Sequence, residues 1–307
     1  MKILIVGAGG VGGYFGGYLL KAGADVTFLV RGRRAEQLGH DGLVIRSAAG
    51  DLTIKAPPMV QIGELEDIYD VVLLSPKAYH LDTLIADLEA RHLSKAHFVP
   101  VLNGLAHIDR FDRAFGRDRV LGGLARISAT LTPEGVIQDL GEMHQIIIGA
   151  RSPASEGIAE AFFKVLARSE LETGLSKDIT AEMWLKFVTL STLAGATCLF
   201  RAPIGIINRT VAGGRIFADL LKEACHVAAS AGYPIAPTEV EALLAQFSDR
   251  DSPLTASTLR DLEAGLPTEG RHIVGDMMYR GYGFGLAMPL YSLAYSHIQA
   301  AELRAGA

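Results

Sequence analysis

Two side chains in the second half of the chain, Lys186 and Glu269, are of types that transfer protons. Lys186 lies in an otherwise apolar run, and a helix there would place Leu190 and Ala194 on the same face as the lysine. Loss of hydration lowers the pKa of a lysine, which suits a general acid that works near neutral pH. A lysine that extends to the solvent fits the same periodicity equally well.

Glu269 falls in the first turn of a helix predicted over Thr268–Arg280. The partial positive charge at a helix N-terminus stabilises a carboxylate at this position. Because glutamate is common at helix starts, the pattern alone favours a capping residue over a catalytic one. Ser257 and Asp261, shortly before it, are also of types that cap helices.

A glycine motif with the spacing G-x-G-x-x-G follows the apolar run Lys2–Val6 and opens a predicted helix, Val11–Ala22. In such a turn Gly7 permits the tight bend, Gly9 lets a pyrophosphate approach the backbone, and Gly12 allows close packing of helix and strand. The N–H groups at the helix start suit a phosphate. A purely structural turn is the alternative, since a chain with 34 glycines matches such spacings easily. The residues predicted to contact a dinucleotide here are Gly7, Gly9, Gly10, Val11 and Gly12.

Arg31 follows the second predicted strand, Asp25–Val30, with Arg33 and Arg34 close behind. A fold that binds NAD commonly has an acidic residue here, which hydrogen-bonds the ribose 2′-hydroxyl. A guanidinium instead pairs bidentately with a phosphate, so Arg31 favours the 2′-phosphate of NADP. The alternative is a solvated basic cluster at a helix start.

Two further polar residues follow predicted strands. Lys77 comes after Tyr69–Leu74, and Asn103 comes after Phe98–Leu102. Because ligands of open α/β sheets bind outside the carboxyl ends of the strands, we expect both side chains at the cofactor crevice. A surface lysine and a simple Asn-Gly turn are the alternatives.

The composition bounds the class of protein. A chain of 307 residues is long enough for two domains, and its net charge of −5, without a basic stripe interleaved with aromatic residues, argues against nucleic-acid binding. Cys198 and Cys225 have no metal-like spacing, so we expect no metal site and a reducing compartment. No signal peptide is evident, and Phe187–Phe200 is short for a membrane span. We therefore expect a cytoplasmic protein without a membrane segment.

The fold class follows from a change of pattern along the chain. Strands and helices alternate in the first half, whereas helical periodicity dominates from about Lys177 onward. This predicts an α/β fold, a Rossmann-type doubly wound parallel sheet followed by an all-α domain. The predicted domains are an NADP-binding domain, residues 1–174, and a helical substrate and dimerisation domain, residues 175–307.

Several elements are predicted besides those named so far. In the first half these are a hairpin of Leu43–Ser47 and Leu52–Lys55, strands at Val120–Leu124, Gly135–Asp139 and Gln145–Gly149, and helices at Leu81–Ala90 and Ser155–Arg168. In the second half the predicted helices are Ile179–Leu199, Val211–Ala231, Pro237–Gln246, Thr268–Arg280 and Leu290–Leu303.

Taken in order, the singled-out residues resemble the ketopantoate reductase (2-dehydropantoate 2-reductase) family over nearly the whole chain. The resemblance rests on Gly7-x-Gly9-x-x-Gly12, Arg31, Lys77, Asn103-Gly104, Trp184-x-Lys186, Ser257-x-x-x-Asp261 and Thr268-Glu269. It implies that NADPH reduces the ketone of ketopantoate to pantoate, on the route to pantothenate and coenzyme A.

The resemblance also implies roles for individual residues. Asn103 would bridge cofactor and substrate, Lys186 would be the catalytic lysine, and Ser257 would contact the substrate. Glu269 would be the catalytic acid that orients the lysine or the substrate hydroxyl. Hydride delivery to a ketone leaves a developing alkoxide, and a lysine can supply both a cation and a proton beside it. The glycines would hold the pyrophosphate, while Arg31 and Lys77 would contact the rest of the cofactor.

The chain departs from the family at two positions. The family commonly carries Asn four and eight residues after the lysine, where this chain has Leu190 and Ala194. Loss of polar partners can shift preference away from a hydroxylated substrate. Thr189, Thr197 or Arg201 could replace the two amides.

Three alternatives stay open at the level of sequence. One is a related reductase of a different, more apolar 2-oxoacid or ketone. Another, of a different class, is a non-catalytic protein that senses NADPH. The apolar helices also allow a homodimer, although no sequence feature identifies its interface.

Overall fold

The chain divides into two compact units. The structure, a computed structural model, describes residues 1–48, 50–141 and 143–306. One unit comprises Met1–Leu102 and His107–Thr180, and the other comprises Asn103–Ala106 and Ala181–Ala307. The segment around Asn103 therefore belongs with the second unit, although the chain on both sides of it belongs to the first. The domain limits predicted from the sequence stay a prediction.

A five-stranded parallel sheet forms the centre of the first unit. Its strand order is β5-β2-β1-β6-β7, so the order reverses between β1 and β6. The doubly wound fold class predicted from the sequence is confirmed. The strands are β1 (Lys2–Val6), β2 (Asp25–Leu29), β5 (Met59–Val60), β6 (Val71–Leu74) and β7 (His97–Pro100).

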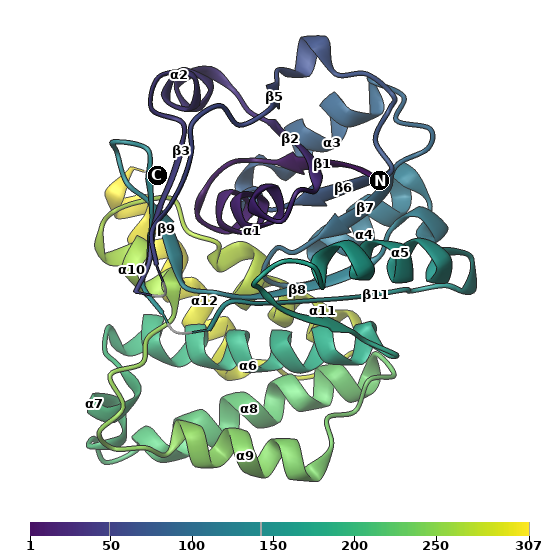
Figure 1. Cartoon of the computed structure of the whole chain (residues 1–307). Coiled ribbons are helices and arrows are strands. Elements are labelled where there is room, and N and C mark those ends of the chain that lie inside the picture. Colours follow the sequence, from purple (N-terminus) through teal and green to yellow (C-terminus); the bar gives the residue numbers. More distant parts are fainter. Residues whose placement is uncertain (49, 142, 307) are drawn as a thin grey trace. The chain divides into compact units, whose positions relative to one another are not determined.

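Alternate residues of β1 face two hydrophobic clusters, one on each side of this sheet. Ile3 and Ile5 pack with side chains of α1 (Gly10–Lys21) and α5 (Glu156–Leu166). Leu4 and Val6 pack with side chains of α3 (Leu81–Glu89) and α4 (Ala106–Phe115). All four strand residues are almost fully buried, as expected for a strand with helices on both faces (Figure 1).

Two smaller sheets complete the first unit. One has the order β4-β3-β10-β9 and contains the predicted hairpin, with β3 and β4 antiparallel. The other has the order β12-β11-β8, and a parallel bridge from Phe98 in β7 reaches Val120, two residues before β8. The strands are β3 (Leu43–Arg46), β4 (Leu52–Ile54), β8 (Gly122–Arg126), β9 (Ala129–Leu131), β10 (Val136–Asp139), β11 (Gln145–Gly149) and β12 (Glu172–Leu175).

The second unit is helical in all its described regular elements, which confirms the predicted all-α half. Two short helices, α7 and α10, were not expected from the periodicity. The helices are α6 (Ile179–Phe200), α7 (Ile204–Asn208), α8 (Gly213–Ser230), α9 (Pro237–Phe247), α10 (Ser257–Glu263), α11 (Asp276–Gly283) and α12 (Pro289–Ala305), with a π-helix at Arg271–Gly275 directly before α11 (Figure 1).

The start of the helix predicted over Thr268–Arg280 is wrong by two residues. Helical structure begins at Gly270 and its first full turn is a π-helix, so Glu269 precedes the helix. The Glu269 carbonyl accepts the N–H groups of His272 (2.9 Å) and Ile273 (3.1 Å). Periodicity at 3.6 residues per turn cannot reveal a π-helix, a form that is frequent near functional sites.

Within the described residues, α6 is the one helix with the length and composition of a membrane span. It has 22 residues and a mean hydropathy of 1.4 over its most apolar window, of which 67% is buried inside the protein. The apolar segment identified in the sequence, Phe187–Phe200, is only part of α6, so the shortness of that segment does not exclude a membrane span. The burial of α6 inside the protein identifies it as a core helix.

Candidate functional site

The glycine turn between β1 and α1 has the geometry of a phosphate-binding turn. Gly7 has φ +90°, a conformation that side chains rarely adopt. A Cβ on Gly12 would overlap the Gly7 carbonyl oxygen and the Ser75 hydroxyl, so α1 approaches the carboxyl ends of β1 and β6 as closely as it can. A Cβ on Gly9 would have no described heavy atom within 4 Å, so the approach to its backbone is open.

The N-terminus of α1 fits a negatively charged group. Its N-cap is Gly9, and no described side chain makes a capping hydrogen bond to its first turn. Unpaired N–H groups and the helix dipole together attract an anion. The turn and the helix start therefore suit the pyrophosphate of a dinucleotide, which is the group that the sequence predicted there.

Packing explains in part why residue 10 is a glycine. A Cβ on this residue would lie 2.5 Å from the carbonyl oxygen of Ala129 in β9, and one on Gly13 would overlap the Ile137 side chain in β10. The second sheet, β4-β3-β10-β9, therefore packs closely against α1. Gly10 was predicted as a cofactor contact, and that role stays a prediction.

Arg31, the first of the three arginines after β2, is exposed and open to a ligand. It precedes α2 (Gly32–Asp41), its side chain is 51% exposed, and its Nη2 lies 2.5 Å from Oδ2 of Asp87 in α3. An exposed ion pair is worth about 0–1 kcal/mol, so a phosphate can compete with Asp87 for the guanidinium. The pairing with Asp87 was not predictable, since the two residues are 56 apart in sequence.

The interpretation of Arg33 and Arg34 as a solvated cluster is wrong for Arg34. Arg33 is exposed and donates to the Pro133 carbonyl oxygen at 2.5 Å. Arg34 is half-buried and donates to the carbonyl oxygens of Ala8 and Gly135, each at 2.8 Å. Burial lowers the pKa of the Arg34 guanidinium to about 10.

Lys77 follows the carboxyl end of β6, as predicted, and is exposed. It is the N-cap residue of a short 3₁₀ helix, Ala78–His80. Two residues earlier, the N–H and the hydroxyl of Ser75 both donate to the Val6 carbonyl oxygen at 3.4 Å. These bonds hold the ends of β6 and β1 together at the point where the strand order reverses.

The structure brings the loop of Asn103 against the segments that carry Lys186 and Glu269. A Cβ on Gly104 would overlap the carbonyl oxygen of His272 and would lie 3.9 Å from the Phe187 side chain. Phe187 directly follows Lys186 in α6, and His272 is three residues after Glu269. Among the predicted residues, Glu269 is buried with 7% exposure, whereas Asn103 and Lys186 are half-buried.

Ser257 is the first residue of α10 and is half-buried. The N–H of the preceding residue, Ala256, donates to the hydroxyl of Thr197 in α6 at 3.4 Å. This bond fixes the start of α10 about three helical turns along α6 from Lys186. The structure therefore connects the start of α10, which begins at Ser257, to the same helix as the lysine.

The side chains named as replacements for the two missing amides are engaged elsewhere. The hydroxyl of Thr189 donates to the Leu185 carbonyl at 2.8 Å, and that of the fully buried Thr197 donates to the Leu193 carbonyl at 2.7 Å. Arg201 donates to the His297 ring at 3.2 Å. Ala194 is 1% exposed, and Leu190 is half-buried, so the face of α6 beyond the lysine is apolar at both positions.

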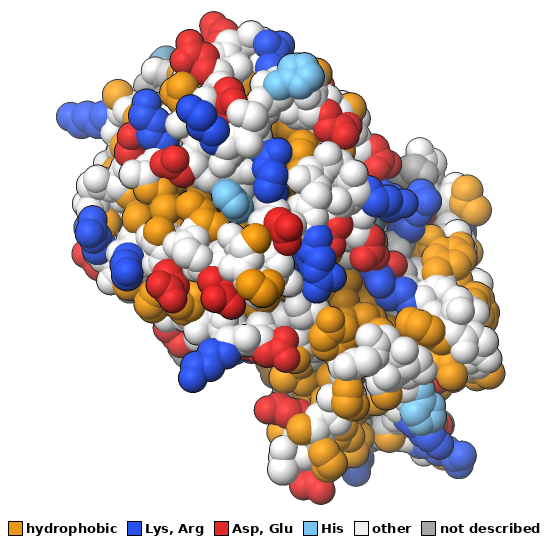
Figure 2. Space-filling view, turned by 90° about the vertical axis from the view of Figure 1, so that its right-hand side faces the viewer, with side chains coloured by type: hydrophobic (Ala, Val, Ile, Leu, Met, Phe, Trp, Pro, Cys, Tyr) orange, Lys and Arg blue, Asp and Glu red, His pale blue; other side chains and the backbone are white. Residues whose placement is uncertain are grey.

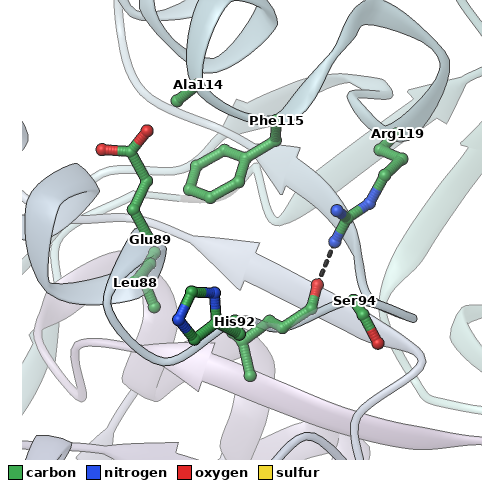
Figure 3. Close-up of a pocket in the computed structure, with 8 residues that line it drawn as sticks. Leu88, Glu89, His92, Ser94, Ala114, Phe115 and Arg119 are labelled. Carbon is green, nitrogen blue, oxygen red and sulfur yellow. Dashed lines mark hydrogen bonds between the residues drawn. The ribbon is translucent and has the colours of Figure 1, made fainter.

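One pocket of the first unit contains none of the residues predicted to act at the site. It has a volume of about 350 Å³, and its lining includes the ends of α3 and α4 (Figure 3). Its lining residues are Leu88, Glu89, His92, Leu93, Ser94, Ala114, Phe115 and Arg119. The Arg119 guanidinium donates to the carbonyls of Leu93 and Ala96, which precede β7. The pocket is therefore at the amino end of β7, opposite the end that Asn103 follows.

Among the described residues, charge and metal-ligand types indicate no further site. Acidic and basic side chains are interspersed over the face drawn in Figure 2, without a single basic stripe. In the part of the chain that the structure describes, no group of three His, Cys, Asp or Glu side chains could hold a metal ion.

Comparison with known proteins identifies relatives over the whole length of the chain. A family model described as Ketopantoate reductase PanE/ApbA matches residues 3–153, and one described as Ketopantoate reductase PanE/ApbA C terminal matches residues 178–302. An uncharacterized oxidoreductase of Bacillus subtilis, YkpB, is 36% identical, and the match covers 98% of this chain and 99% of the relative. A 2-dehydropantoate 2-reductase of Pyrococcus abyssi is 27% identical over 100% of this chain and 99% of its own.

A solved structure shares the fold. The ternary structure of D-mandelate dehydrogenase with NADH and anilino(oxo)acetate has a TM-score of 0.88 against this chain and covers 100% of both chains. At 22% sequence identity, this likeness shows a common fold.

Proposed function

The chain belongs to the ketopantoate reductase family, and from this membership we propose that it uses NADPH to reduce 2-dehydropantoate to pantoate. Membership confirms the predicted family and the predicted enzyme class, an NADP-dependent oxidoreductase that acts on CH–OH groups. The product places the proposed reaction in pantothenate and coenzyme A biosynthesis.

One observation carries the assignment of the site: the packing of Gly104 against both α6 and the π-helix. It supports a site in which Asn103, Lys186 and Glu269 act together, because a Cβ on Gly104 would lie 3.9 Å from the side chain of Phe187, the residue after the lysine, and would overlap the carbonyl oxygen of His272, three residues after the glutamate. The three side chains come from segments more than 80 residues apart in the chain, and family membership covers all three segments.

Each of these side chains has a role that its chemistry supports. When bound, NADPH supplies a hydride to the ketone carbon. Lys186 would then stabilise the developing alkoxide and give it a proton, while Glu269 would orient the lysine or the substrate hydroxyl. Asn103 would hold the substrate with its amide, and Ser257 would add a hydroxyl contact.

The cofactor is held by the first unit in this proposal. The backbone N–H groups of the glycine turn would bind the pyrophosphate, and Arg31 would bind the 2′-phosphate, which is the group that distinguishes NADPH from NADH. Lys77 would add a cation at the carboxyl end of β6. The exposed guanidinium of Arg31 supports this preference for NADPH.

A second candidate substrate is a more apolar 2-oxoacid. It is favoured by Leu190 and Ala194, which leave α6 without amides at the two positions where the family commonly has them, and by the other uses of the Thr189 and Thr197 hydroxyls. A structural neighbour, D-mandelate dehydrogenase, is named for a substrate with an aromatic ring and was solved with anilino(oxo)acetate. That neighbour shows that the fold can serve such a substrate.

Oxidation of NADPH, followed by its absorbance, tests both candidates. The substrates are 2-dehydropantoate and a panel of 2-oxoacids with larger apolar or aromatic groups. Highest kcat/KM with 2-dehydropantoate supports the first candidate, and highest kcat/KM with an apolar 2-oxoacid supports the second. Tight NADPH binding without turnover of any of these substrates would instead support a non-catalytic protein that senses NADPH.

Cellular location and oligomeric state stay predictions of this proposal. A cytoplasmic enzyme agrees with the two free cysteines, Cys198 and Cys225. A homodimer would need an apolar surface, and Phe284 and Leu293 of the helical unit are 46% and 55% exposed. Light scattering on the purified chain measures its mass, and a mass of one chain would contradict the dimer.

A further inference from the structure

Arg34 joins three segments of the first unit that are far apart in the chain. It lies in the first turn of α2, and its Nε and Nη1 donate to the carbonyl oxygens of Ala8 and Gly135. Ala8 lies inside the glycine turn, and Gly135 lies in the turn between β9 and β10. A single side chain therefore ties the glycine turn to the second sheet.

The guanidinium is held without a carboxylate partner among the described residues. Its described partners are the two carbonyl oxygens and, at 3.5 Å, the side-chain amide oxygen of Gln37. Burial of a charge is unfavourable unless it is well hydrogen-bonded. With a pKa lowered to about 10, the group nevertheless stays protonated at neutral pH. The hydrogen bonds to the carbonyl oxygens of Ala8 and Gly135 compensate for the partial loss of hydration of this cation.

The bond to Ala8 fixes the direction of the next N–H group. In a planar trans peptide the carbonyl and the following N–H point in opposite directions. Because Arg34 holds the Ala8 oxygen, the Gly9 N–H points away from Arg34. Among the described residues this N–H has no acceptor, and a Cβ on Gly9 would have no described heavy atom within 4 Å.

We propose that Arg34 is a positioning residue for the cofactor, which fixes the Ala8–Gly9 peptide so that the Gly9 N–H faces the pyrophosphate. The inference rests on the proposed function only in placing the dinucleotide at the glycine turn. The pyrophosphate is common to NADPH and NADH. Arg34 therefore strengthens the binding of both cofactors equally, whereas Arg31 acts on NADPH alone.

Binding of NADPH and NADH to the full chain, measured by titration calorimetry, tests this. Arg34→Met weakens the binding of both cofactors by about tenfold or more, because a hydrogen bond from a charged group is lost. The ratio of the two Kd values stays the same. The KM for NADPH rises, while kcat at saturating NADPH stays within about twofold of wild type. Arg31→Met is the comparison: it weakens the binding of NADPH and leaves the binding of NADH unchanged.

Two further variants distinguish the effect of the two hydrogen bonds of Arg34 from the effect of its charge and from the general effect of removing a half-buried arginine. Arg34→Lys keeps the cation but cannot fork between Ala8 and Gly135, so it weakens both cofactors as the methionine does. Arg91→Met removes another half-buried arginine that donates to a backbone carbonyl, that of Gly63, and leaves both affinities unchanged. If Arg34→Met does not fold, Arg34→Lys carries the test alone.

Several outcomes would overturn the inference. Wild-type affinity for both cofactors in Arg34→Met or in Arg34→Lys would show that the paired hydrogen bonds from Arg34 to Ala8 and Gly135 are dispensable. A loss confined to NADPH would make Arg34 a second reader of the 2′-phosphate instead. A wild-type chain that binds neither cofactor would overturn the proposed function itself, which is a different result from any loss seen only in the variants.

Discussion

The backbone of Gly104 lies so close to the carbonyl oxygen of His272 that a Cβ on Gly104 would come within 3.0 Å of that oxygen. Gly104 also has φ +84°, a conformation that favours glycine. Since backbone atoms stand on both sides of this contact, neither can move aside as a flexible side chain would. The contact therefore sets the position of Asn103 relative to the helix that follows Glu269.

Gly104→Ala should lower both stability and turnover. The added Cβ must push apart the Asn103 loop and the π-helix, and the left-handed backbone adds strain, so we expect a loss of about 2–4 kcal/mol in the free energy of unfolding. Turnover should fall because Asn103 shifts relative to Lys186 and Glu269. Denaturant unfolding and steady-state kinetics on the same preparation measure the two effects.

The chain offers a matched control for this substitution. Gly116 has φ +83°, but a Cβ there would have no described heavy atom within 4 Å. Gly116→Ala thus introduces the backbone strain without the collision, at about 1 kcal/mol, and leaves turnover unchanged. Equal losses in the two variants would mean that the approach of Gly104 to His272 is unimportant.

The parts of the fold that were predictable are those decided by local pattern. The run Lys2–Val6 and the glycine spacing after it predict β1, the turn and α1, because the apolar strand and its glycines are neighbours in the chain. β5 was missed because its two residues, Met59–Val60, are too few to show a period. Its place at the edge of the sheet depends on pairing with β2, in which each partner residue lies 31 positions earlier.

The parts of the site that were not predictable depend on contacts between distant residues. Arg34 reads as one member of a basic cluster, and only its partners Ala8 and Gly135 reveal a link to the glycine turn. In the same way, the need for a glycine at position 10 becomes evident only from its contact with β9. The roles of Lys186 and Glu269 stay predictions, since geometry alone does not measure proton transfer.

Lys186→Ala should reduce turnover by about two orders of magnitude or more while NADPH still binds. The reason is that the variant lacks the group proposed to give a proton to the developing alkoxide. Steady-state kinetics and calorimetric binding of NADPH measure the two properties separately. Lys222→Ala, which removes an exposed lysine of α8 in the same unit, should leave both unchanged. Wild-type turnover in the Lys186 variant would remove this lysine from the mechanism.

His97 should make the protein less stable in mild acid. Burial, together with the positive charge of Arg119, lowers the pKa of the His97 ring below its ordinary value of 6.5. The unfolded chain then binds a proton at a higher pH than the folded chain does. The stability that His97 contributes is therefore fully present above pH 6.5 and is lost as the pH falls from there through the lowered pKa.

The free energy of unfolding, measured by denaturant at several values between about pH 7 and about pH 5, checks this. In His97→Asn the decrease of stability with falling pH should be shallower than in wild type. His40→Asn, at a ring whose side chain is 87% exposed, serves as the comparison and should follow the wild-type curve. Parallel curves for wild type and His97→Asn would show that the ring is not responsible.

Leu190→Asn should shift substrate preference toward the hydroxylated 2-oxoacid. Leu190 is one turn after Lys186 on the half-buried face of α6, and an amide there could hydrogen-bond the substrate hydroxyl. One added hydrogen bond predicts an increase of about tenfold in kcat/KM for 2-dehydropantoate relative to an apolar 2-oxoacid. Leu199→Asn, a half-buried leucine more than two turns further along α6, should not change that ratio. An unchanged ratio in Leu190→Asn as well would mean that this position does not face the substrate and does not favour an apolar 2-oxoacid.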